Sequence, residues 1–298
     1  MPLRNDSPVV LSFMERAQRT GGGVAVAYFR IFPIGAKTWY IKETTGVGSY
    51  LFEGGEKALL LDTCNGFRDI RKTVGKLTDK PLTVVNSHGH SDHAGGNNQF
   101  QEVYIHPADL FMTDASWQKN QRDTMYGYVK KRLPLLSPFL NRMERNRPCI
   151  YDAKHIAIEG GAAFDLGGRT LPVTHCPGHS PGIIILADEQ TKTLYVGDAI
   201  NNGMFLFFEG SPKLAEYAAR LREIAKLGGF DEIRGSHSED PLPFSFIGYY
   251  ADFLERVTME KSKATGFPNE GNVVYGYKED GRSIGLKSVA AYFTKDQV

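Results

Sequence analysis

Apolar residues in this chain are grouped in short runs, and polar or glycine-rich stretches separate these runs. Short runs rich in Val, Ile, Leu and aromatic side chains are typical of β-strands that are at least half buried. The predicted strands lie near residues 24–32, 38–44, 48–53, 57–62, 82–85, 103–105, 155–158, 169–174, 183–187, 193–196 and 231–234.

Helical spacing of apolar residues appears between and after these runs. Residues 66–77 predict one helix, and the stripe from Phe246 to Val257 predicts another. Ser211-Pro212 has the residue types of an N-cap and first helical position, and the stripe from Leu214 to Ala225 follows it with core-facing spacing. Glu279-Asp280-Gly281 predicts a hairpin turn between two short strands. The alternation of strands and helices predicts an α/β fold.

One hexapeptide fits neither the alternation of a strand nor the spacing of a helix. Residues 88–93 read His-Gly-His-Ser-Asp-His, directly after the strand-like run 82–85 and just before Gly95-Gly96. Histidine and aspartate are costly to bury without partners, so packing does not explain them. Imidazole nitrogen and carboxylate oxygen are ligands that suit zinc, and also iron and manganese. The hexapeptide therefore predicts a metal site on a loop at a strand end, rather than a histidine-rich polar loop.

Three later residues repeat this arrangement of a strand followed by a ligand. His179 lies in the turn Cys176-Pro177-Gly178-His179-Ser180-Pro181-Gly182, between two predicted strands. Asp198 ends the run Thr193–Asp198, and His237 follows the run Asp231–Arg234. Taken singly, a lone histidine or a Gly-Asp pair is usually a surface residue or a turn. The recurrence predicts that all three complete the site.

With these motifs, from about Gly48 to His237, the chain resembles the metallo-β-lactamase superfamily of metallo-hydrolases. The resemblance implies a four-layer αββα sandwich. It also implies a first metal bound by His88, His90 and His179, a second bound by Asp92, His93 and His237, and a bridging Asp198. Asp62 resembles the family's outer carboxylate that orients a ligand histidine.

Departures from individual subfamilies narrow the activity. Asp198 stands where the β-lactamase subclass carries cysteine, and His90 stands where di-iron oxygen reductases carry glutamate. Asn201 occupies the position of a tyrosine in acyl-homoserine lactonases, and the C-terminal basic motif of hydroxyacylglutathione hydrolases is not evident. The bridging aspartate is similar to that of thioesterases, lactonases and phosphodiesterases of the superfamily.

The ligand set predicts a binuclear metallo-hydrolase. Two divalent ions, zinc first with iron or manganese as alternatives, would share a bridging hydroxide. This hydroxide would cleave a thioester, lactone or carboxylic ester of a small, partly apolar substrate, with Asp92 also acting as the proton acceptor. The alternatives are a mononuclear iron enzyme that oxidises persulfides, a phosphodiester or β-lactam hydrolase, and a binding protein with a vestigial site. The complete ligand set argues against the last.

The segment 107–148 predicts a helical insertion within a single domain of residues 1–298. It is rich in bulky side chains and carries eight basic against four acidic residues, a local excess of +4. The basic residues are Lys119, Arg122, Lys130, Lys131, Arg132, Arg142, Arg145 and Arg147. Two interpretations stay open: a lid with an apolar wall and basic anchors over the metals, or an ordinary helical pair packed on the body. The run Met204–Phe208 is a candidate second apolar wall or a buried strand.

Composition agrees with a soluble enzyme of the cytoplasm, and the partner expected from the site is a small-molecule substrate. The net charge of +1 implies no bulk attraction to nucleic acid or acidic membranes, and no apolar run reaches the length of a membrane span. Residues 1–23 lack a signal-like apolar core, and three scattered cysteines suit a reducing compartment. Cys176, beside His175, is interpreted as a buried residue rather than a nucleophile. A homo-oligomer is left open.

Overall fold

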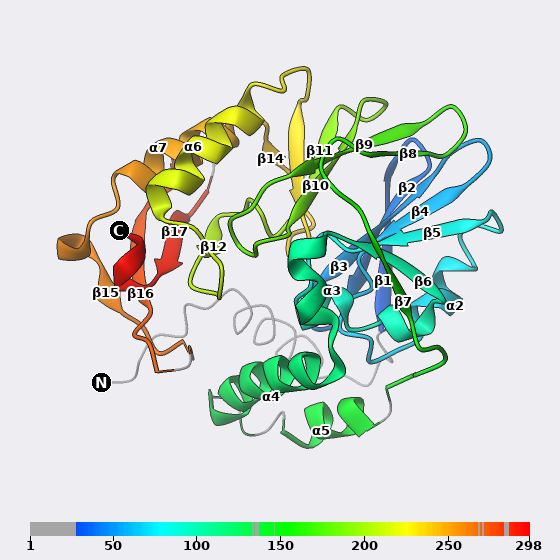
Figure 1. The fold of residues 1–298 in the computed structure, drawn as a ribbon, viewed down its shortest axis with the longest axis horizontal. Coiled ribbons are helices and arrows are strands. Elements are labelled where there is room, and N and C mark those ends of the chain that lie inside the picture. The colour runs from blue at the N-terminus through cyan, green and yellow to red at the C-terminus, as the bar shows by residue number, and fades with distance from the viewer. Residues whose placement is uncertain are drawn as a thin grey trace.

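The computed structural model describes residues 28–298, except residues 133, 135, 136, 146, 268, 270 and 283–285 (Figure 1). The N-terminal part of the predicted strand 24–32 and the expectations for residues 1–23 lie outside this range, as do Leu135 and Leu136 of the insertion. None of the described helices is long and apolar enough to cross a membrane.

The first sheet has seven strands, counted over the described residues, in the order β1 to β7. They are β1 Phe29–Gly35, β2 Thr38–Glu43, β3 Gly48–Glu53, β4 Ala58–Leu61, β5 Leu82–Val85, β6 Glu102–Ile105 and β7 Lys154–Ala157. Strands β4 and β5 pair in parallel, so their carboxyl ends lie at the same edge of the sheet. Asp62 follows β4 at that edge, and the hexapeptide follows β5.

The second sheet has the order β14-β13-β11-β10-β9-β8. Its strands are β8 Ala163–Asp165, β9 Thr170–His175, β10 Ile184–Asp188, β11 Thr193–Gly197, β13 Glu232–Gly235 and β14 Leu242–Pro243. Here β11 and β13 are the parallel pair, which brings Asp198 and His237 to one edge. The topology thus delivers ligands from both sheets to a common end.

Three apolar cores separate four layers. Tyr50, Leu61, Ile184 and Tyr195 belong to a core between the two sheets. Helix α2 (Ile70–Val74) covers the outer face of the first sheet, where Leu60 packs with Ile70. Helices α6 (Leu214–Ala225) and α7 (Phe246–Glu255) lie side by side over the second sheet (Figure 1). The predicted αββα sandwich is confirmed.

A buried ion pair ties the two sheets together. Arg169, which precedes β9, donates to the carboxylate of Asp188 at the end of β10, and their side chains are 1% and 0% exposed. The same guanidinium donates to the carbonyl of Ala36 at 2.8 Å and to Thr38 Oγ1 at 2.6 Å in the first sheet. Arg169 therefore connects the end of the second sheet to the first sheet through contacts made inside the protein. The pair in this way helps to fix how the two sheets lie against each other.

The insertion is helical, as predicted, and it contacts the metal-binding loop. It contains the 3₁₀ helix η2 (Pro107–Thr113), α4 (Ala115–Arg132) and α5 (Ser137–Arg145), and in Figure 1 α4 and α5 lie below α3 (Ser91–Ala94). Gln118 of α4 donates to Gly89 O at 2.8 Å, and Gln121 Oε1 accepts from Ser91 N at 2.6 Å. Tyr126 donates to Asn65 Oδ1 at 2.7 Å.

The remaining strands form a third sheet of order β12-β17-β16-β15. They are β12 Gly203–Phe205, β15 Lys263–Ala264, β16 Tyr275–Asp280 and β17 Ser288–Phe293. Strands β16 and β17 are antiparallel neighbours, so two strands do pair here as predicted. The predicted turn position was wrong, because Glu279 and Asp280 belong to β16 and pair with Val289 and Ser288. The parallel pairing of β12 with the C-terminal β17 had no counterpart in the sequence expectations.

Two predicted helix starts were wrong. Helix α6 begins at Leu214 with Lys213 at the N-cap, because the hydroxyl of Ser211 instead donates to the carbonyl of His179. Helix α2 covers only Ile70–Val74 of the predicted 66–77, since Asp69 caps it by accepting from Lys72 N at 2.9 Å.

Candidate metal centre

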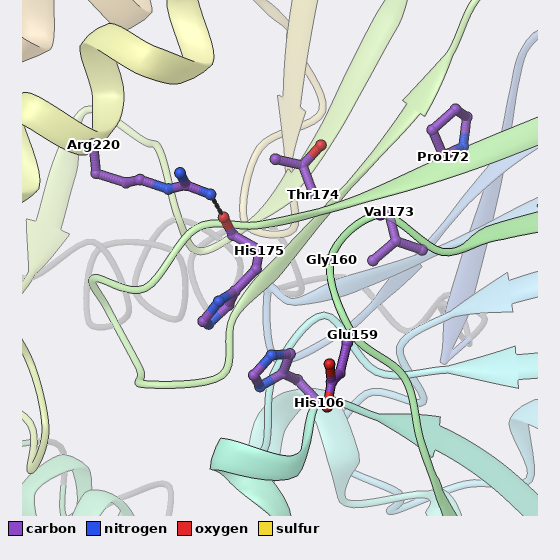
Figure 2. A pocket seen from close by; sticks show the side chains of 9 residues that line it. His106, Glu159, Gly160, Pro172, Val173, Thr174, His175 and Arg220 are labelled. Atoms are coloured by element: carbon purple, nitrogen blue, oxygen red, sulfur yellow. Dashed lines mark hydrogen bonds between the residues drawn. The ribbon is translucent and has the colours of Figure 1, made fainter.

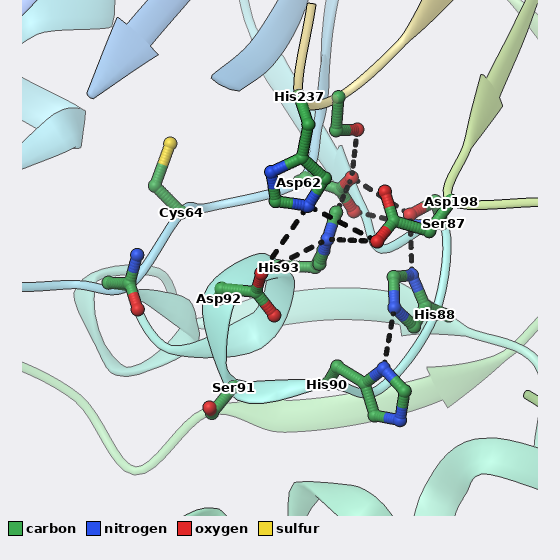
Figure 3. A network of polar contacts seen from close by, with 12 residues as sticks. Asp62, Cys64, Ser87, His88, His90, Ser91, Asp92, His93, Asp198 and His237 are labelled. Carbon is green, nitrogen blue, oxygen red and sulfur yellow. Dashed lines mark hydrogen bonds and ion pairs between the residues drawn. The ribbon is translucent and has the colours of Figure 1, made fainter. Parts of the chain in front are cut away.

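The structure brings all seven predicted ligands to one end of the sandwich, where loops from both sheets meet. Figure 3 shows His88, His90, Asp92, His93, Asp198 and His237 of this set. The residues fall into three overlapping groups whose ligand atoms all lie within 4.8 Å of one another. The groups are His88, His90 and His179; His88, His93 and Asp198; and Asp92, His93 and His237. The first and third groups are the two ligand sets that the family resemblance implied.

Three histidines converge in the first group. His90 Nδ1 lies 3.0 Å from His88 Nε2 and 2.9 Å from His179 Nε2. All three residues are buried. Burial and the neighbouring imidazoles hold the pKa of His88 and His90 well below the usual range. The rings are therefore neutral, which is the form in which imidazole binds a metal.

The third group, taken together with Asp198, combines two carboxylates with two histidines. Asp92 Oδ2 lies 3.7 Å from His93 Nε2 and 3.5 Å from His237 Nε2. Asp198 Oδ2 lies 3.6 Å from His93 Nε2, 3.2 Å from His237 Nε2 and 3.7 Å from His179 Nε2. Because His179 belongs to the first group, and His93 and His237 belong to the third, Asp198 has the position of a bridging ligand.

Outer hydrogen bonds fix which nitrogen faces the cluster in three of the histidines, His88, His93 and His179. His93 Nδ1 donates to Asp62 Oδ2 at 2.9 Å, and His179 Nδ1 donates to the carbonyl of Phe205 at 2.7 Å. Ser87 Oγ donates to Asp62 at 2.8 Å, so it accepts from His88 Nδ1 at 3.0 Å. In each ring the proton is on Nδ1, and the lone pair of Nε2 is aimed at the cluster.

This arrangement fits bound metal ions. His93 Nε2 and Asp198 Oδ1 are buried and have no hydrogen-bond partner among the described residues. Buried polar atoms without partners cost roughly 1–3 kcal/mol each, so an isolated protein would not aim several lone pairs at one point without compensation. A cation supplies that compensation. The donor set of imidazole and carboxylate suits divalent zinc, iron or manganese.

Asp62 lies outside the cluster and orients the side chains of Ser87 and His93. It follows β4 with a φ of +68°, a left-handed conformation that aspartate adopts more readily than most residues. Its Oδ1 accepts from Ser87 N at 2.7 Å, while Oδ2 accepts from Ser87 Oγ and His93 Nδ1. The geometry matches the outer role that the resemblance implied.

A second buried carboxylate, Asp109, was missed by sequence reasoning. It lies in η2, is fully buried, and joins the two loops that carry the first group. Its oxygens accept from Gly89 N at 3.1 Å, Ser180 Oγ at 2.6 Å and Gly182 N at 2.6 Å. A Cβ added at Gly182 would lie 2.7 Å from Asp109 Cγ, so the contact requires glycine there. From the sequence, Asp109 was counted only among the four acidic residues of the insertion.

The metal cluster opens into a cavity of about 460 Å³. His90, Asp92, His179, Asp198 and His237 are at its wall. Helix α4 contributes Gln121, Arg122, Met125 and Tyr126, and the stretch after Asp198 contributes Phe205 and Phe208. Both segments that the sequence singled out as candidate walls therefore line the cavity. Among the described residues of the insertion, Arg122 is the one basic side chain at the wall, and it pairs with Glu144.

A second hollow of about 600 Å³ lies away from the cluster (Figure 2). His106 and His175 stack there with ring centroids 3.9 Å apart. His106 Nδ1 accepts from Ala108 N, and His175 Nε2 donates to Pro181 O at 2.8 Å. Neither histidine joins a metal-ligating group of the described residues.

The cysteines are free, as expected. Burial raises the pKa of the Cys176 thiol to about 12, so it stays protonated at neutral pH. A thiol in that state is a poor nucleophile, which supports the interpretation of Cys176 as a packed residue.

The model of the metallo-β-lactamase superfamily matches residues 44–238. Acyl-coenzyme A thioesterase MBLAC2 of Gallus gallus is 26% identical over 231 residues, covering 72% of this chain and 82% of that protein. The protein of the same name from Homo sapiens is 28% identical over 211 residues, covering 63% and 71%.

Solved structures share the fold at low sequence identity. A metallo-β-lactamase from Pontibacter korlensis superposes with a TM-score of 0.54 at 16% identity, covering 77% of this chain and all of that one. An archaeal superfamily protein from Sulfolobus tokodaii gives a TM-score of 0.51 at 16% identity, covering 82% and 91%.

Proposed function

This chain belongs to the metallo-β-lactamase superfamily, and from that premise we propose that it is a metal-dependent hydrolase that cleaves acyl thioesters. The observation that carries the proposal is the convergence of seven ligand side chains on one point, five of them at the wall of one cavity. His88, His90 and His179 would hold one divalent ion, Asp92, His93 and His237 a second, and Asp198 both. Zinc is the first candidate, with iron or manganese as alternatives.

Bound divalent ions would supply an acidified water as nucleophile and a positive charge that stabilises the oxyanion of the substrate. The chain's own residues make that chemistry possible by orientation. Asp62 and Ser87 hold the lone pairs of His93 and His88 toward the cluster, and the carbonyl of Phe205 does the same for His179. Because these groups are fixed before substrate binds, little reorganisation is needed during reaction.

Asp92 is the proposed proton acceptor. Its side chain is 35% exposed and lines the cavity, whereas His93 beside it is fully buried. One carboxylate oxygen faces His93 and His237, which leaves the second to take the proton of the attacking water and release it to solvent. A thiolate is a good leaving group, so cleavage of a thioester does not require a separate general acid.

Two observations favour thioesters over lactones and carboxylic esters. The relatives named acyl-coenzyme A thioesterase align with 72% and 63% of this chain. The cavity also offers apolar side chains, including Phe205, Phe208 and Met125, beside the ligands. These support an acyl substrate with an apolar part.

The test is thiol release from acyl-coenzyme A thioesters by protein whose metal content has been measured. We expect about two zinc ions per chain, loss of turnover after chelation, and recovery when zinc, iron or manganese is returned. His155→Gln serves as control, because His155 lies on β7 outside the cluster and glutamine can still accept from Asn97. Full turnover by metal-free protein would overturn the proposal, and so would failure of the metal-loaded protein to hydrolyse any thioester.

A further inference from the structure

The apolar wall of the cavity begins at the first metal-binding group. The ring of Phe208 lies 4.4 Å from the ring of His90 and 5.1 Å from that of His179, measured between centroids. Phe205 lines the same cavity, and its carbonyl accepts from His179 Nδ1. A group held at the cluster would therefore continue directly along aromatic surface.

The C-terminal sheet holds this wall in place. Strand β12 pairs in parallel with β17, so Phe205 lies opposite Tyr292, and Leu206 N donates to Tyr292 O at 2.8 Å. Asn269 Nδ2 donates to the carbonyl of Phe207 at 3.0 Å, and Gln297 donates to that of Leu206. The backbone on both sides of the wall is thus fixed by residues near the end of the chain.

Aromatic packing supports the same wall from behind. Phe267 lies 5.0 Å from Phe205 and 6.0 Å from Phe207 between ring centroids, and Tyr292 lies 5.1 Å from Phe205. Phe267 and Tyr292 are not at the cavity wall, and they lie beyond the residues matched by the family model. The shape of the wall therefore depends on a part of the chain outside the superfamily core.

The charge of the cavity favours an apolar occupant along this wall. Arg122 is the one arginine or lysine at the described wall, and it is already engaged by Glu144 and Gln118. Asp240 adds a carboxylate at the wall. A phosphate group that leaves water needs several cationic side chains to replace its hydration, so it gains little binding free energy along this wall. A hydrocarbon chain gains binding free energy simply by leaving water.

We propose, on the basis of the proposed thioesterase function, that Phe205 and Phe208 form the subsite for the acyl chain of the substrate. The C-terminal sheet, through Phe267 and its neighbours, sets the shape of this subsite and thereby the preferred chain length. The thioester carbonyl lies at the metal cluster, the hydrocarbon lies along the aromatic wall, and the thiol carrier extends toward solvent.

The experiment is a chain-length series of acetyl, butyryl, hexanoyl and octanoyl thioesters, each on coenzyme A and on the small carrier N-acetylcysteamine. In the wild type, kcat/KM rises by about threefold to fourfold per methylene while the chain still contacts the wall. The rise is the same on both carriers, because it belongs to the acyl chain. Phe205→Ala and Phe267→Ala each lower the ratio of octanoyl to acetyl kcat/KM, by roughly tenfold or more for Phe205→Ala.

A matched control and a binding measurement separate this from general damage. Phe230→Ala removes a half-buried aromatic that lies away from the cavity, and the ratio stays at the wild-type value. The octyl thioether of coenzyme A, which cannot be hydrolysed, binds zinc-loaded wild type at least tenfold more tightly than Phe205→Ala. Coenzyme A itself binds both proteins equally.

The outcomes distinguish the two proposals. A protein that hydrolyses no thioester overturns the proposed function. A protein that hydrolyses acetyl and octanoyl thioesters with equal kcat/KM keeps that function and overturns the acyl-chain subsite. The subsite is also overturned if the chain-length preference persists in Phe205→Ala, Phe208→Ala and Phe267→Ala. A cooperative thermal unfolding transition shows that each of these variants is folded.

Discussion

The carboxylate of Asp109 accepts a hydrogen bond from the hydroxyl of Ser180 at 2.6 Å, although 71 residues separate them in sequence. The same carboxylate accepts from the amides of Gly89 and Gly182. Gly89 lies between His88 and His90, and Ser180 directly follows His179. One buried side chain therefore sets the spacing between the two loops that carry the first metal-binding group.

We predict that Asp109→Asn lowers the affinity for metal by about 10–100-fold, the usual cost of losing an outer partner of a metal ligand. Asparagine offers one acceptor oxygen in place of two, so at least one of the three donors loses its partner. Competition with a chromophoric chelator measures the affinity. Ser180→Ala, which removes one donor, should have a smaller effect.

Asp123→Asn is the control for this prediction. Asp123 belongs to the same insertion, but its side chain is exposed and paired with Lys119. Its metal affinity should equal that of the wild type. An unchanged metal affinity in Asp109→Asn would show that the clamp does not position the ligands.

Asp62→Asn should weaken metal binding by a different route. An amide NH₂ cannot accept from both Ser87 Oγ and His93 Nδ1, and it favours the His93 tautomer with the proton on Nε2. That proton would point at the metal position. We expect a loss of affinity of about 10–100-fold in the chelator competition. The exposed Asp165→Asn provides the comparison, and equal affinities in the two variants would contradict the orienting role of Asp62.

Asp92→Asn tests the proposed proton acceptor. We expect kcat for thioester hydrolysis to fall by about 10²–10⁴-fold, the range attributed to general acid–base catalysis, with an additional loss if the second ion is released. The fold should persist, because Asp92 is 35% exposed and contributes little to the core. Steady-state kinetics together with circular dichroism check both expectations. Wild-type turnover in this variant would remove Asp92 from the mechanism.

The part of the site that could be predicted from the sequence consists of residues whose chemical type is not explained by a strand or helix pattern. His88, His90 and His93 stood out because neither a strand nor a helix requires them at that spacing. The strand ends before Asp198 and His237 were visible from apolar runs, and the parallel pairing of β11 with β13 brings them together. The structure brings every predicted ligand to the cluster, and their metal-binding roles stay predictions.

The unpredictable part consists of residues whose role depends on what folds against them. Asp109 has the same sequence appearance as the exposed Asp114, and only the approach of the His179 loop makes it a clamp. Likewise, the apolar run after Asp198 indicated a wall, but its pairing with β17 joins residues 87 positions apart, such as Gly203 and Ala290, which no local pattern reports. Ser211 was predicted as a helix cap, and its hydroxyl was instead taken by the His179 carbonyl.

The ion pair between Arg169 and Asp188 gives a prediction on stability that does not involve the metal. In Asp188→Ala, the Arg169 guanidinium stays buried and keeps its contacts with Ala36 and Thr38, but it loses its carboxylate. Breaking a buried pair in this way costs about 3–5 kcal/mol, because an uncompensated charge is left inside. Urea unfolding of metal-free protein measures the change without a contribution from metal binding.

The double variant Arg169→Met/Asp188→Leu separates the charge from the packing. Replacing both partners by apolar side chains leaves no buried charge, so we expect most of the lost stability to return. Full recovery is not expected, because Thr38 and the carbonyl of Ala36 lose the guanidinium that donates to them. If the double variant is as unstable as Asp188→Ala, the pair acts through specific hydrogen bonds to the first sheet rather than through charge compensation. If Asp188→Ala is as stable as the wild type, the pair does not hold the two sheets together.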